Sequence, residues 1–333
     1  MTRGILVTGA SGLLGRTVAL QLIERGESVT VLQRGDSKVP ARQVRGDISD
    51  PEARYAALEG VDRVIHCAAK VSINGPEAEF KRVNIDGTSA LLASARERGV
   101  HSFVHVSTPS VAHLGNAIHG DHAQPANPRL ARGNYARTKA ESELIALEAC
   151  ASGFDVCAIR PHLVWGPGDE QLIGRILARA SAGRLFLVDH GYALIDTTYI
   201  DNAASALIAA LDTCSANAGR AFVISNGEPR TVAELFERIC RAAGQRPPSR
   251  SVPASVAYRA GAVAERLWGD SEPPLTSFLV EQLATAHWFD QREARSALNW
   301  APTVSLDEGF RRLTAHYGTR VAPPSTAMSV PVT

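Results

Sequence analysis

Short apolar segments alternate with amphipathic ones along the first two hundred residues, and this alternation limits the possible folds more than any other feature of the sequence. Five segments are nearly continuously apolar, rich in β-branched residues and bounded by Gly, Asp or Pro: 4–10, 28–34, 61–69, 102–108 and 154–161. Helical patterns lie between them, at 12–25, 51–59, 77–98 and 134–151. This order predicts an α/β fold in which a doubly wound parallel sheet carries helices on both faces.

Beyond Trp165 the pattern is less regular and becomes mostly helical. Six helices are predicted there, near 170–182, 201–212, 231–243, 254–268, 276–286 and 305–316. We expect a first domain of residues 1–165, to which 195–225 return, and a smaller, mainly helical second domain made of 166–194 and 226–318. Residues 319–333 are predicted to form a disordered tail.

The composition narrows the class of protein. A chain of 333 residues with 45% hydrophobic and 21% charged residues is typical of a globular protein with a sizeable core. The net charge of +1 gives no basic surface for nucleic acid or anionic membranes. Five scattered cysteines without CxxC spacing favour reduced thiols and a cytoplasmic location. We expect neither a signal peptide before the strand at Gly4 nor a transmembrane segment.

The stretch VTGASGLLG, residues 7–15, ends the first predicted strand and opens the first helix. Its glycines allow a sharp turn, a close approach of the backbone to a pyrophosphate, and tight packing of the helix on the sheet. The helix then offers free N–H groups and a positive dipole end to the anion. The stretch therefore predicts a dinucleotide site, with these turn residues in contact with the cofactor: Gly9, Ser11, Gly12, Leu13, Leu14 and Gly15.

The end of the second strand indicates which dinucleotide binds. An acidic residue there would accept hydrogen bonds from the adenosine ribose and repel a 2′-phosphate. This chain has Gln33 and Arg34 instead, with Asp36 close by. Because a guanidinium can bind a phosphate through charge-assisted hydrogen bonds, we expect Arg34 to select NADPH over NADH.

Tyr135 precedes Lys139 by four residues, so both side chains lie on one face of the helix predicted at 134–151. The chain has only four lysines against 31 arginines, which makes this pairing notable. Reduction of a ketone needs a proton on the oxygen, and a tyrosine hydroxyl can supply it. A neighbouring ammonium favours the tyrosinate needed for the reverse reaction, and it can also reach ribose hydroxyls.

The GxxGxxG spacing, together with this Tyr–Lys pair, resembles the extended branch of the short-chain dehydrogenase/reductase family. The resemblance implies a Rossmann-type sheet and a third catalytic residue, Thr108, with Ser107 as the alternative. By the same resemblance, five further cofactor contacts are expected, together with the ribose contacts of Tyr135 and Lys139: Asp47 and Ile48 in RGDISD, Ala68 and Ala69 in HCAAK, and Pro161 in RPHLVWGPGD. Asn84, in VNIDGT, would support the cofactor side of the site.

Within RPHLVWGPGD, His162 and Trp165 depart from the residues more common in the family. They either reshape the floor of the pocket or simply pack in the core.

Six stretches resemble a subgroup of the steroid-dehydrogenase-like members, the 2-alkyl-3-oxoalkanoate reductases of bacterial olefin and β-lactone biosynthesis: 107–113, 163–172, 196–204, 224–229, 265–268 and 272–283. The resemblance implies NADPH-dependent reduction of a long-chain 2-alkyl-3-oxoalkanoate, a homodimer formed through helices 77–98 and 134–151, and association with enzymes of the same pathway. An arginine of the segment 170–184 is expected to anchor the substrate carboxylate.

Three alternative functions remain open. A 3β-hydroxysteroid or sterol dehydrogenase would share the chemistry. A nucleotide-sugar epimerase or dehydratase would need cations for a diphosphate, and Arg175, Arg179 and Arg184 are candidates. A non-catalytic NADP sensor would not need the proton donor Tyr135.

Two further patterns are better explained by structure than by function. The histidines of the loop 110–133, His113, His119 and His122, lack the spacing of a metal site, so no metal is expected. The segment 255–268 could lie on a membrane surface, but its charges and single Trp favour a helix of the second domain.

Overall fold

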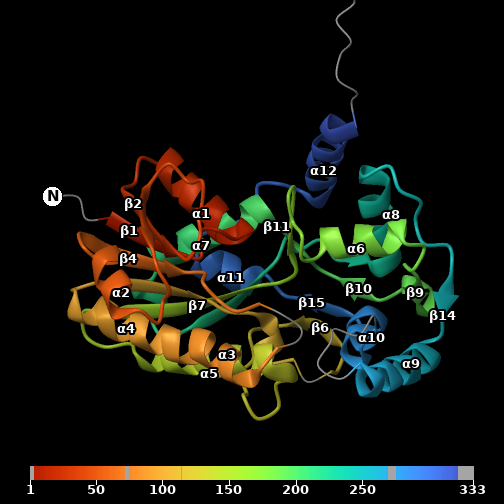
Figure 1. Ribbon diagram of the computed structural model, residues 1–333, viewed down its shortest axis with the longest axis horizontal. Helices are drawn as coiled ribbons and strands as arrows, with labels where there is room; N and C mark the ends of the chain where they lie inside the picture. Colours follow the sequence, from red (N-terminus) through yellow and green to blue (C-terminus); the bar gives the residue numbers. More distant parts are fainter. Residues whose placement is uncertain (1–3, 72–74, 114, 269–274, 322–333) are drawn as a thin grey trace, which may run out of the picture.

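The computed structural model describes residues 4–71, 75–113, 115–268 and 275–321. It has two lobes, a larger one around a parallel sheet and a smaller one that contains α8, α9 and α10 (Figure 1). Seven strands form the parallel sheet in the spatial order β12-β7-β5-β4-β1-β2-β3. Their bounds are β1 (Gly4–Thr8), β2 (Val29–Gln33), β3 (Arg42–Arg45), β4 (Val61–His66), β5 (Ser102–Val106), β7 (Asp155–Pro161) and β12 (Ala221–Ile224).

The doubly wound sheet predicted from the sequence is confirmed, and all five predicted strands belong to it. Strands β3 and β12 were not predicted from the sequence. The first is an edge strand of sequence RQVR whose side chains are mostly exposed, so it carries no apolar signal. The second has only four residues, AFVI, which is too short for a reliable pattern.

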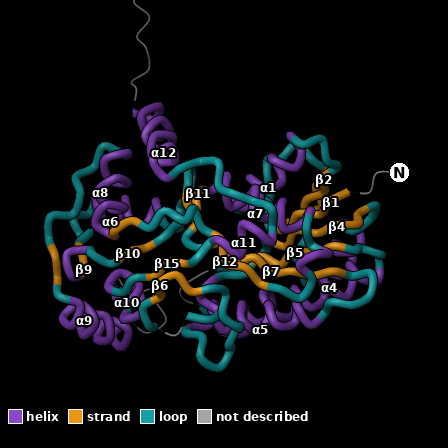
Figure 2. Tube along the Cα trace, turned by 180° about the vertical axis from the view of Figure 1, so that it is seen from behind, coloured by secondary structure: helices purple, strands orange, loops and turns teal. Residues whose placement is uncertain are grey.

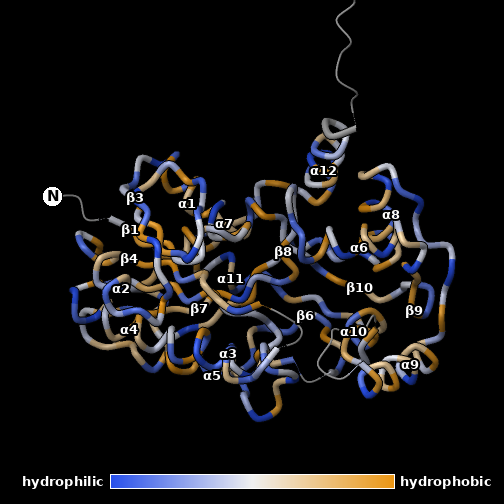
Figure 3. The backbone as a smooth tube through the Cα atoms, in the orientation of Figure 1, coloured by the Kyte–Doolittle hydropathy of each residue, from blue (hydrophilic) through white to orange (hydrophobic). Residues whose placement is uncertain are grey.

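Helices cover both faces of this sheet, and the alternation of side chains along β1 decides what each face contacts (Figure 2). Ile5 and Val7 belong to the apolar cluster that includes residues of α1 and α7, whereas Leu6 belongs to the cluster on the opposite face, with α2 and α4. Strands β1 and β4 are among the more hydrophobic segments of the backbone (Figure 3). The helices of this lobe are α1 (Leu13–Glu24), α2 (Pro51–Ala57), α4 (Gly87–Glu97), α5 (Gly133–Glu148), α7 (Ile200–Asp212) and α11 (Arg292–Ala297).

The helix predicted at 77–98 contains a change of winding. Its first turn is α3 (Glu77–Phe80), its middle is the π-helical segment η1 (Lys81–Asp86), and α4 completes it. A π-helical turn inserts an extra residue and often lies at a functional site. Here the segment contains Asn84.

The smaller lobe contains a second sheet, of order β13-β10-β15-β6, which the sequence analysis did not predict. Its strands have only two to four residues, too few to show a period of two. Their bounds are β6 (Ile118–Asp121), β10 (Leu194–Ile195), β13 (Arg230–Thr231) and β15 (His287–Phe289). The helices beside it are α6 (Ile173–Ser181), α8 (Val232–Ala242), α9 (Ala254–Leu267), α10 (Ser277–Ala284) and α12 (Leu306–Val321). The remaining short elements are β8 (Val164–Trp165), β9 (Leu187–Val188), β11 (Thr198–Tyr199), β14 (Ser251–Val252), η2 (Pro109–Val111), η3 (Asp189–Gly191) and η4 (Ser215–Asn217).

Two segments pack outside the domain in which the sequence analysis placed them. Strand β6 comes from the first domain but pairs with β15 in the small sheet. Helix α11 comes from the second domain, yet Ala294 lies in the apolar cluster of the large sheet. Helix α12 continues to Val321, beyond the predicted end at residue 316, and the remainder of the predicted tail lies outside the described residues.

Candidate active site

Close backbone contacts require glycine at two positions between β1 and the first turn of α1. Gly9 has a φ of 74°, and a Cβ at this position would lie 2.8 Å from the amide nitrogen of Ala68. A Cβ on Gly15 would lie 2.5 Å from the carbonyl oxygen of Gly9. The start of α1 therefore sits directly on the turn, and its first N–H groups, which have no acceptor within the helix, are available to an anion.

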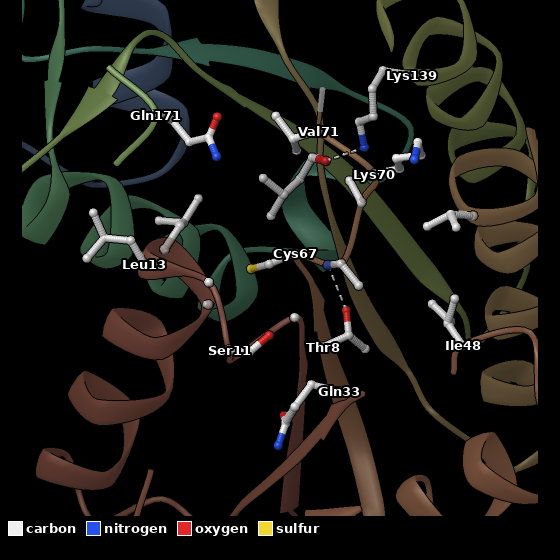
Figure 4. A pocket seen from close by; sticks show the side chains of 18 of the residues that line it. Thr8, Ser11, Leu13, Gln33, Ile48, Cys67, Lys70, Val71, Lys139 and Gln171 are labelled. Atoms are coloured by element: carbon white, nitrogen blue, oxygen red, sulfur yellow. Dashed lines mark hydrogen bonds between the residues drawn. The ribbon is translucent and has the colours of Figure 1, made fainter. Parts of the chain in front are cut away.

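A cavity of about 700 Å³ runs along this turn and past the carboxyl ends of the strands (Figure 4). Ligands of open α/β sheets bind at this edge, and the volume is typical of a small-molecule site. All the predicted site residues except Asn84 line it: Gly9, Ser11, Gly12, Leu13, Leu14, Gly15, Arg34, Asp47, Ile48, Ala68, Ala69, Thr108, Tyr135, Lys139 and Pro161. The alternative Ser107 lines it too, and its buried hydroxyl has no hydrogen-bond partner within the described part of the chain.

Arg34 lies exposed at the end of β2, with no hydrogen bond or ion pair to any described residue. The nearby carboxylate of Asp36 pairs instead with Arg45 at 3.5 Å. The amide oxygen of Gln33 is buried and also lacks a partner among the described residues, while its amide nitrogen donates to Gln43 at 3.2 Å. This end of the cavity therefore offers a guanidinium that has no partner among the described residues.

Asp47 and Ile48 follow β3 on the wall of the same cavity. The Asp47 carboxylate accepts a hydrogen bond from the hydroxyl of Ser49 at 2.7 Å and another from Arg82 at 3.3 Å. Ile48 packs so closely on the start of α4 that a Cβ on Gly87 would lie 2.7 Å from its side chain. These contacts hold Asp47 and Ile48, two of the expected cofactor contacts, in place.

A buried hydrogen-bond chain, not predicted from the sequence, holds the end of β4 against β1. The Thr8 hydroxyl accepts from the amide of Ala68 at 3.0 Å and lies 2.7 Å from Nδ1 of His66. The other ring nitrogen of His66 lies 3.0 Å from the hydroxyl of Thr88. Burial lowers the pKa of His66 to about 3, so the ring is neutral at physiological pH. This series of hydrogen bonds fixes Ala68 and Ala69 relative to the glycine turn.

The helix α5 brings Tyr135 and Lys139 to the cavity, and η2 begins directly after Thr108. Burial raises the pKa of Tyr135 to about 12, and hydrogen bonding with Thr108 opposes this shift. The sequence analysis instead expected Lys139 to lower this pKa. In the structure, burial outweighs any such lowering. The tyrosine is therefore protonated throughout the physiological range, as a proton donor must be.

Lys139 is buried and its amine donates a hydrogen bond to the carbonyl oxygen of Val106 at 2.6 Å (Figure 4). The amine also lies 3.2 Å from Nε2 of His105. Burial lowers the pKa of Lys139 to about 8, and the charge of Glu143 opposes this shift. Lys139 is thus a positively charged group near neutral pH that can lose its proton slightly above it.

Asn84 does not line the cavity but connects two segments that do. Its amide oxygen accepts from the backbone N–H of Lys70 at 2.7 Å, and its amide nitrogen donates to the carbonyl of Lys70 at 3.3 Å. The same nitrogen lies 3.1 Å from the hydroxyl of Thr138, the residue before Lys139. Asn84 therefore positions the loop after β4 relative to the helix of Tyr135.

His162 and Trp165 pack in the core rather than on the cavity wall. His162 bonds to Asp196 through Nδ1, and its Nε2 lies 3.1 Å from His287. The Trp165 ring stacks on Phe310 with centroids 4.6 Å apart. Both residues thus contribute to the packing where the two lobes meet.

The histidines of the loop 110–133 are dispersed. The His113 ring is buried 6.3 Å from that of His287, His119 is paired with Trp288 across β6 and β15, and His122 lies 3.5 Å from Glu293. The described residues contain no group of His, Cys, Asp or Glu arranged to hold a metal ion. None of their helices is long and apolar enough to cross a membrane.

The arginines proposed as anion anchors, Arg175, Arg179 and Arg184, are absent from the described lining of the cavity. Two residues that sequence reasoning did not select, Lys70 and Gln171, do line it. Gln171 directs its amide into the cavity from the side opposite Lys70 and Lys139 (Figure 4). The rarity of lysine in this chain was the one signal that could have singled out Lys70.

The parallel sheet, the glycine turn and the tyrosine–lysine pair together define an α/β oxidoreductase of the dinucleotide-binding type. A family model described as the NAD dependent epimerase/dehydratase family matches residues 5–225. The chain belongs to this family, within the extended short-chain dehydrogenases/reductases.

Individual relatives are similar over nearly the whole chain. The chain is 41% identical to the 2-alkyl-3-oxoalkanoate reductase of Stenotrophomonas maltophilia, over 93% of this chain and 98% of the relative. It is 29% identical to the decarboxylating sterol-4-alpha-carboxylate 3-dehydrogenase of Mus musculus, over 92% of this chain and 88% of that protein. A short-chain dehydrogenase/reductase superfamily protein from Agrobacterium tumefaciens, solved with bound NAD, superposes with a TM-score of 0.74 at 21% identity, over 95% of this chain and 97% of that chain. The last comparison shows the fold alone.

Proposed function

We propose that this protein uses NADPH to reduce the 3-oxo group of a long-chain 2-alkyl-3-oxoalkanoate to the 2-alkyl-3-hydroxyalkanoate. The observation that carries the proposal is the 41% identity, over 93% of the chain, to a reductase named for this substrate. The cavity supports it, because Thr108, Tyr135 and Lys139 lie on its wall.

Several features of the cavity support a nicotinamide dinucleotide with a 2′-phosphate as the cofactor. The glycine turn and the start of α1 would bind the pyrophosphate, because a side chain at Gly9 or Gly15 would collide with the backbone. Arg34 would bind the 2′-phosphate, and its guanidinium has no competing partner among the described residues. Lys139 would hold ribose hydroxyls, and Pro161 would lie against the nicotinamide.

The residues of the site divide the chemistry among them. When bound, NADPH supplies the hydride to C3 of the substrate. Tyr135 donates its proton to the C3 oxygen, and the pKa of about 12 keeps this proton in place until charge develops on that oxygen. Thr108 holds the same oxygen by a hydrogen bond. The ammonium of Lys139 stabilises the tyrosinate that remains, because opposite charges favour one another at short range.

The clearest test is the reverse reaction, because free 3-oxo acids decarboxylate readily. Purified protein is incubated with NADP⁺ and 2-alkyl-3-hydroxyalkanoates of increasing chain length, and NADPH formation is followed by absorbance. Each buried methylene contributes about 0.8 kcal/mol, so KM should fall steeply with chain length until the cavity is filled. Matched assays use a 3β-hydroxysteroid and a nucleotide sugar. Oxidation of the steroid without oxidation of the branched hydroxy acids would refute the proposal.

A sterol dehydrogenase is the second candidate, and the 29% identity to the sterol-4-alpha-carboxylate 3-dehydrogenase of Mus musculus favours it. The two candidates share a reacting oxygen and a carboxylate on adjacent carbon atoms. They differ in the apolar body, which is two flexible chains in one and a rigid ring system in the other. The assay above separates them.

A further inference from the structure

The substrate class proposed above places a second demand on the cavity. In a 2-alkyl-3-oxoalkanoate the carboxylate is attached to C2, next to the C3 carbon that receives the hydride. A carboxylate near a buried reaction centre loses its hydration and must be paired with a cation or with several hydrogen-bond donors. The cation must lie near Tyr135 and Thr108, because a single carbon separates the carboxylate from C3.

Four cationic side chains line the described cavity: Arg34, Lys70, Arg82 and Lys139. Arg82 donates to Asp47 and to Ser49, at 3.3 and 2.9 Å, so it belongs with Arg34 to the adenosine end. Lys139 is bonded to the carbonyl of Val106 and serves the tyrosine and the ribose. Lys70 is therefore the one of these four cations that has no role in binding the adenosine, the ribose or the tyrosine.

The backbone of Lys70 is fixed relative to the catalytic helix. Both hydrogen bonds of the Lys70 peptide groups go to Asn84, whose amide nitrogen lies 3.1 Å from the hydroxyl of Thr138 on α5. Further along the same loop, the carbonyl of Gly75 accepts from Asn134, the residue before Tyr135, at 3.3 Å. The backbone at Lys70 is thus linked to the helix of the proton donor through Asn84, and the backbone at Gly75 is bonded to that helix directly. Figure 4 shows Lys70 and Lys139 on the same side of the cavity.

The side chain of Lys70 is held in place in the absence of a substrate. Its ammonium forms an ion pair with Glu79 and lies 5.3 Å from the centre of the Phe80 ring. The Lys70 side chain is only 26% exposed, whereas that of Glu79 is 54% exposed. An ammonium has three donors, so a second carboxylate can bind while Glu79 stays or as it turns out to solvent. The carboxylate of Glu79 therefore occupies a position beside the Lys70 ammonium that the substrate carboxylate could take.

We propose that the ammonium of Lys70 binds the substrate carboxylate and thereby selects 3-oxo acids over neutral ketones, with Glu79 as the internal carboxylate that it pairs with before substrate binds. The assignment rests on the proposed function. It makes Lys70 a specificity-determining residue, distinct from the proton donor Tyr135 and from the cofactor contacts.

The test compares a 2-alkyl-3-hydroxyalkanoate with its methyl ester, in oxidation by NADP⁺, for the wild type and Lys70→Met. The substitution removes the charge and keeps the length of the side chain. The wild type should prefer the acid, and Lys70→Met should reduce kcat/KM for the acid by about tenfold to a hundredfold, the range for a lost charge-assisted hydrogen bond. The ester should change by less than about threefold, because it offers no charge to Lys70. Lys70→Arg should restore most of the preference for the acid, and Glu79→Gln should lower KM for the acid.

Lys81→Met is the matched control, because Lys81 is exposed and is absent from the described lining of the cavity. It removes one lysine charge eleven residues further along and should leave the acid-to-ester ratio unchanged. Equal losses for acid and ester in Lys70→Met, or an unchanged ratio, would overturn the assignment.

A binding measurement separates this inference from the proposed function. The probe is a long-chain 2-alkylalkanoate, which has the carboxylate but no oxygen to react, titrated calorimetrically in the presence of NADP⁺. An affinity that falls at least tenfold in Lys70→Met supports the anchor. This holds even if the hydroxy acid is not oxidised, because lack of oxidation would count against the proposed reaction alone. Equal affinity in wild type and variant, or no binding to either, would overturn the anchor.

Discussion

Glu143 accepts two hydrogen bonds from the guanidinium of Arg160, at 2.9 and 2.5 Å, and both side chains are almost completely buried. The pair joins α5, one turn after Lys139, to β7, one residue before Pro161. Arg160 donates a third hydrogen bond, 2.7 Å long, to the carbonyl of Gln124, and so it also holds the loop that precedes α5. The catalytic helix is therefore held to the sheet through a buried ion pair.

Glu143→Gln should lower the free energy of unfolding by about 3–5 kcal/mol, because Arg160 would remain charged and buried without its counter-ion. Urea denaturation followed by circular dichroism measures this change. Glu141→Gln is the control, since Glu141 lies on the same helix but is exposed, and it should change stability by less than about 0.5 kcal/mol. A loss below 1 kcal/mol for Glu143→Gln would mean that the pair contributes little.

Tyr135→Phe should abolish turnover and leave NADPH affinity nearly unchanged, because it removes the proton donor alone. Lys139→Met should impair both, since its ammonium serves the tyrosine and the ribose. Steady-state kinetics gives the first quantity and fluorescence titration with NADPH gives the second. A Tyr135→Phe protein that keeps more than half of the wild-type rate would exclude Tyr135 as the donor.

Arg34→Ala should weaken NADPH binding by about tenfold to a hundredfold, because a charge-assisted hydrogen bond to a phosphate contributes about 1.5–3 kcal/mol. The affinity for NADH, which has no 2′-phosphate, should change little. The two titrations are run on one preparation, with Arg241→Ala as the control because Arg241 is exposed on α8 and is absent from the described lining of the cavity. Equal losses for both cofactors would place Arg34 outside the phosphate site.

The parts of this site that could be predicted from the sequence are those encoded by residues close together in the chain. The glycine turn occupies seven residues, and Tyr135 and Lys139 are one helical turn apart, so local geometry alone brings them together. The predicted parallel strands were detectable because each is a buried apolar run.

The parts that could not be predicted depend on contacts between distant residues. Nothing local links Lys139 to the carbonyl of Val106, 33 residues earlier. The burial that raises the Tyr135 pKa, where the spacing suggested a lowering, also depends on residues distant in the chain. The pairing of His287 with Ile118 in the small sheet joins strands of three and four residues that lie about half the chain apart. Asn84 was expected to support the cofactor side of the site, but its partners, Lys70 and Thr138, are distant in the chain and could not be read from the local sequence.

The pH dependence of cofactor binding should report the titration of Lys139. Burial lowers the pKa of this group from 10.5 to about 8, so the ammonium is present below pH 8 and is lost as the pH rises through that value. NADPH affinity should therefore fall between about pH 7 and 9, as the charge that would hold the ribose disappears. The same titration on Lys139→Met should show no such step. A wild-type affinity that is constant up to pH 10 would mean that the lysine stays charged or does not contact the cofactor.

The protein should form a homodimer. Helices α4 and α5 lie side by side on one face of the large sheet (Figure 1), and the family resemblance implies that they pack on the same helices of a second copy. Because α5 carries Tyr135 and Lys139, a change that separates the two copies should lower the activity as well as the molar mass in solution. Leu144 is only partly buried on α5, so Leu144→Glu should place a charge in this interface and shift the protein to monomers in light scattering. Leu194→Glu, on an exposed position of β10, is the control and should leave the dimer intact. A fully active wild-type monomer at micromolar concentration would contradict the prediction.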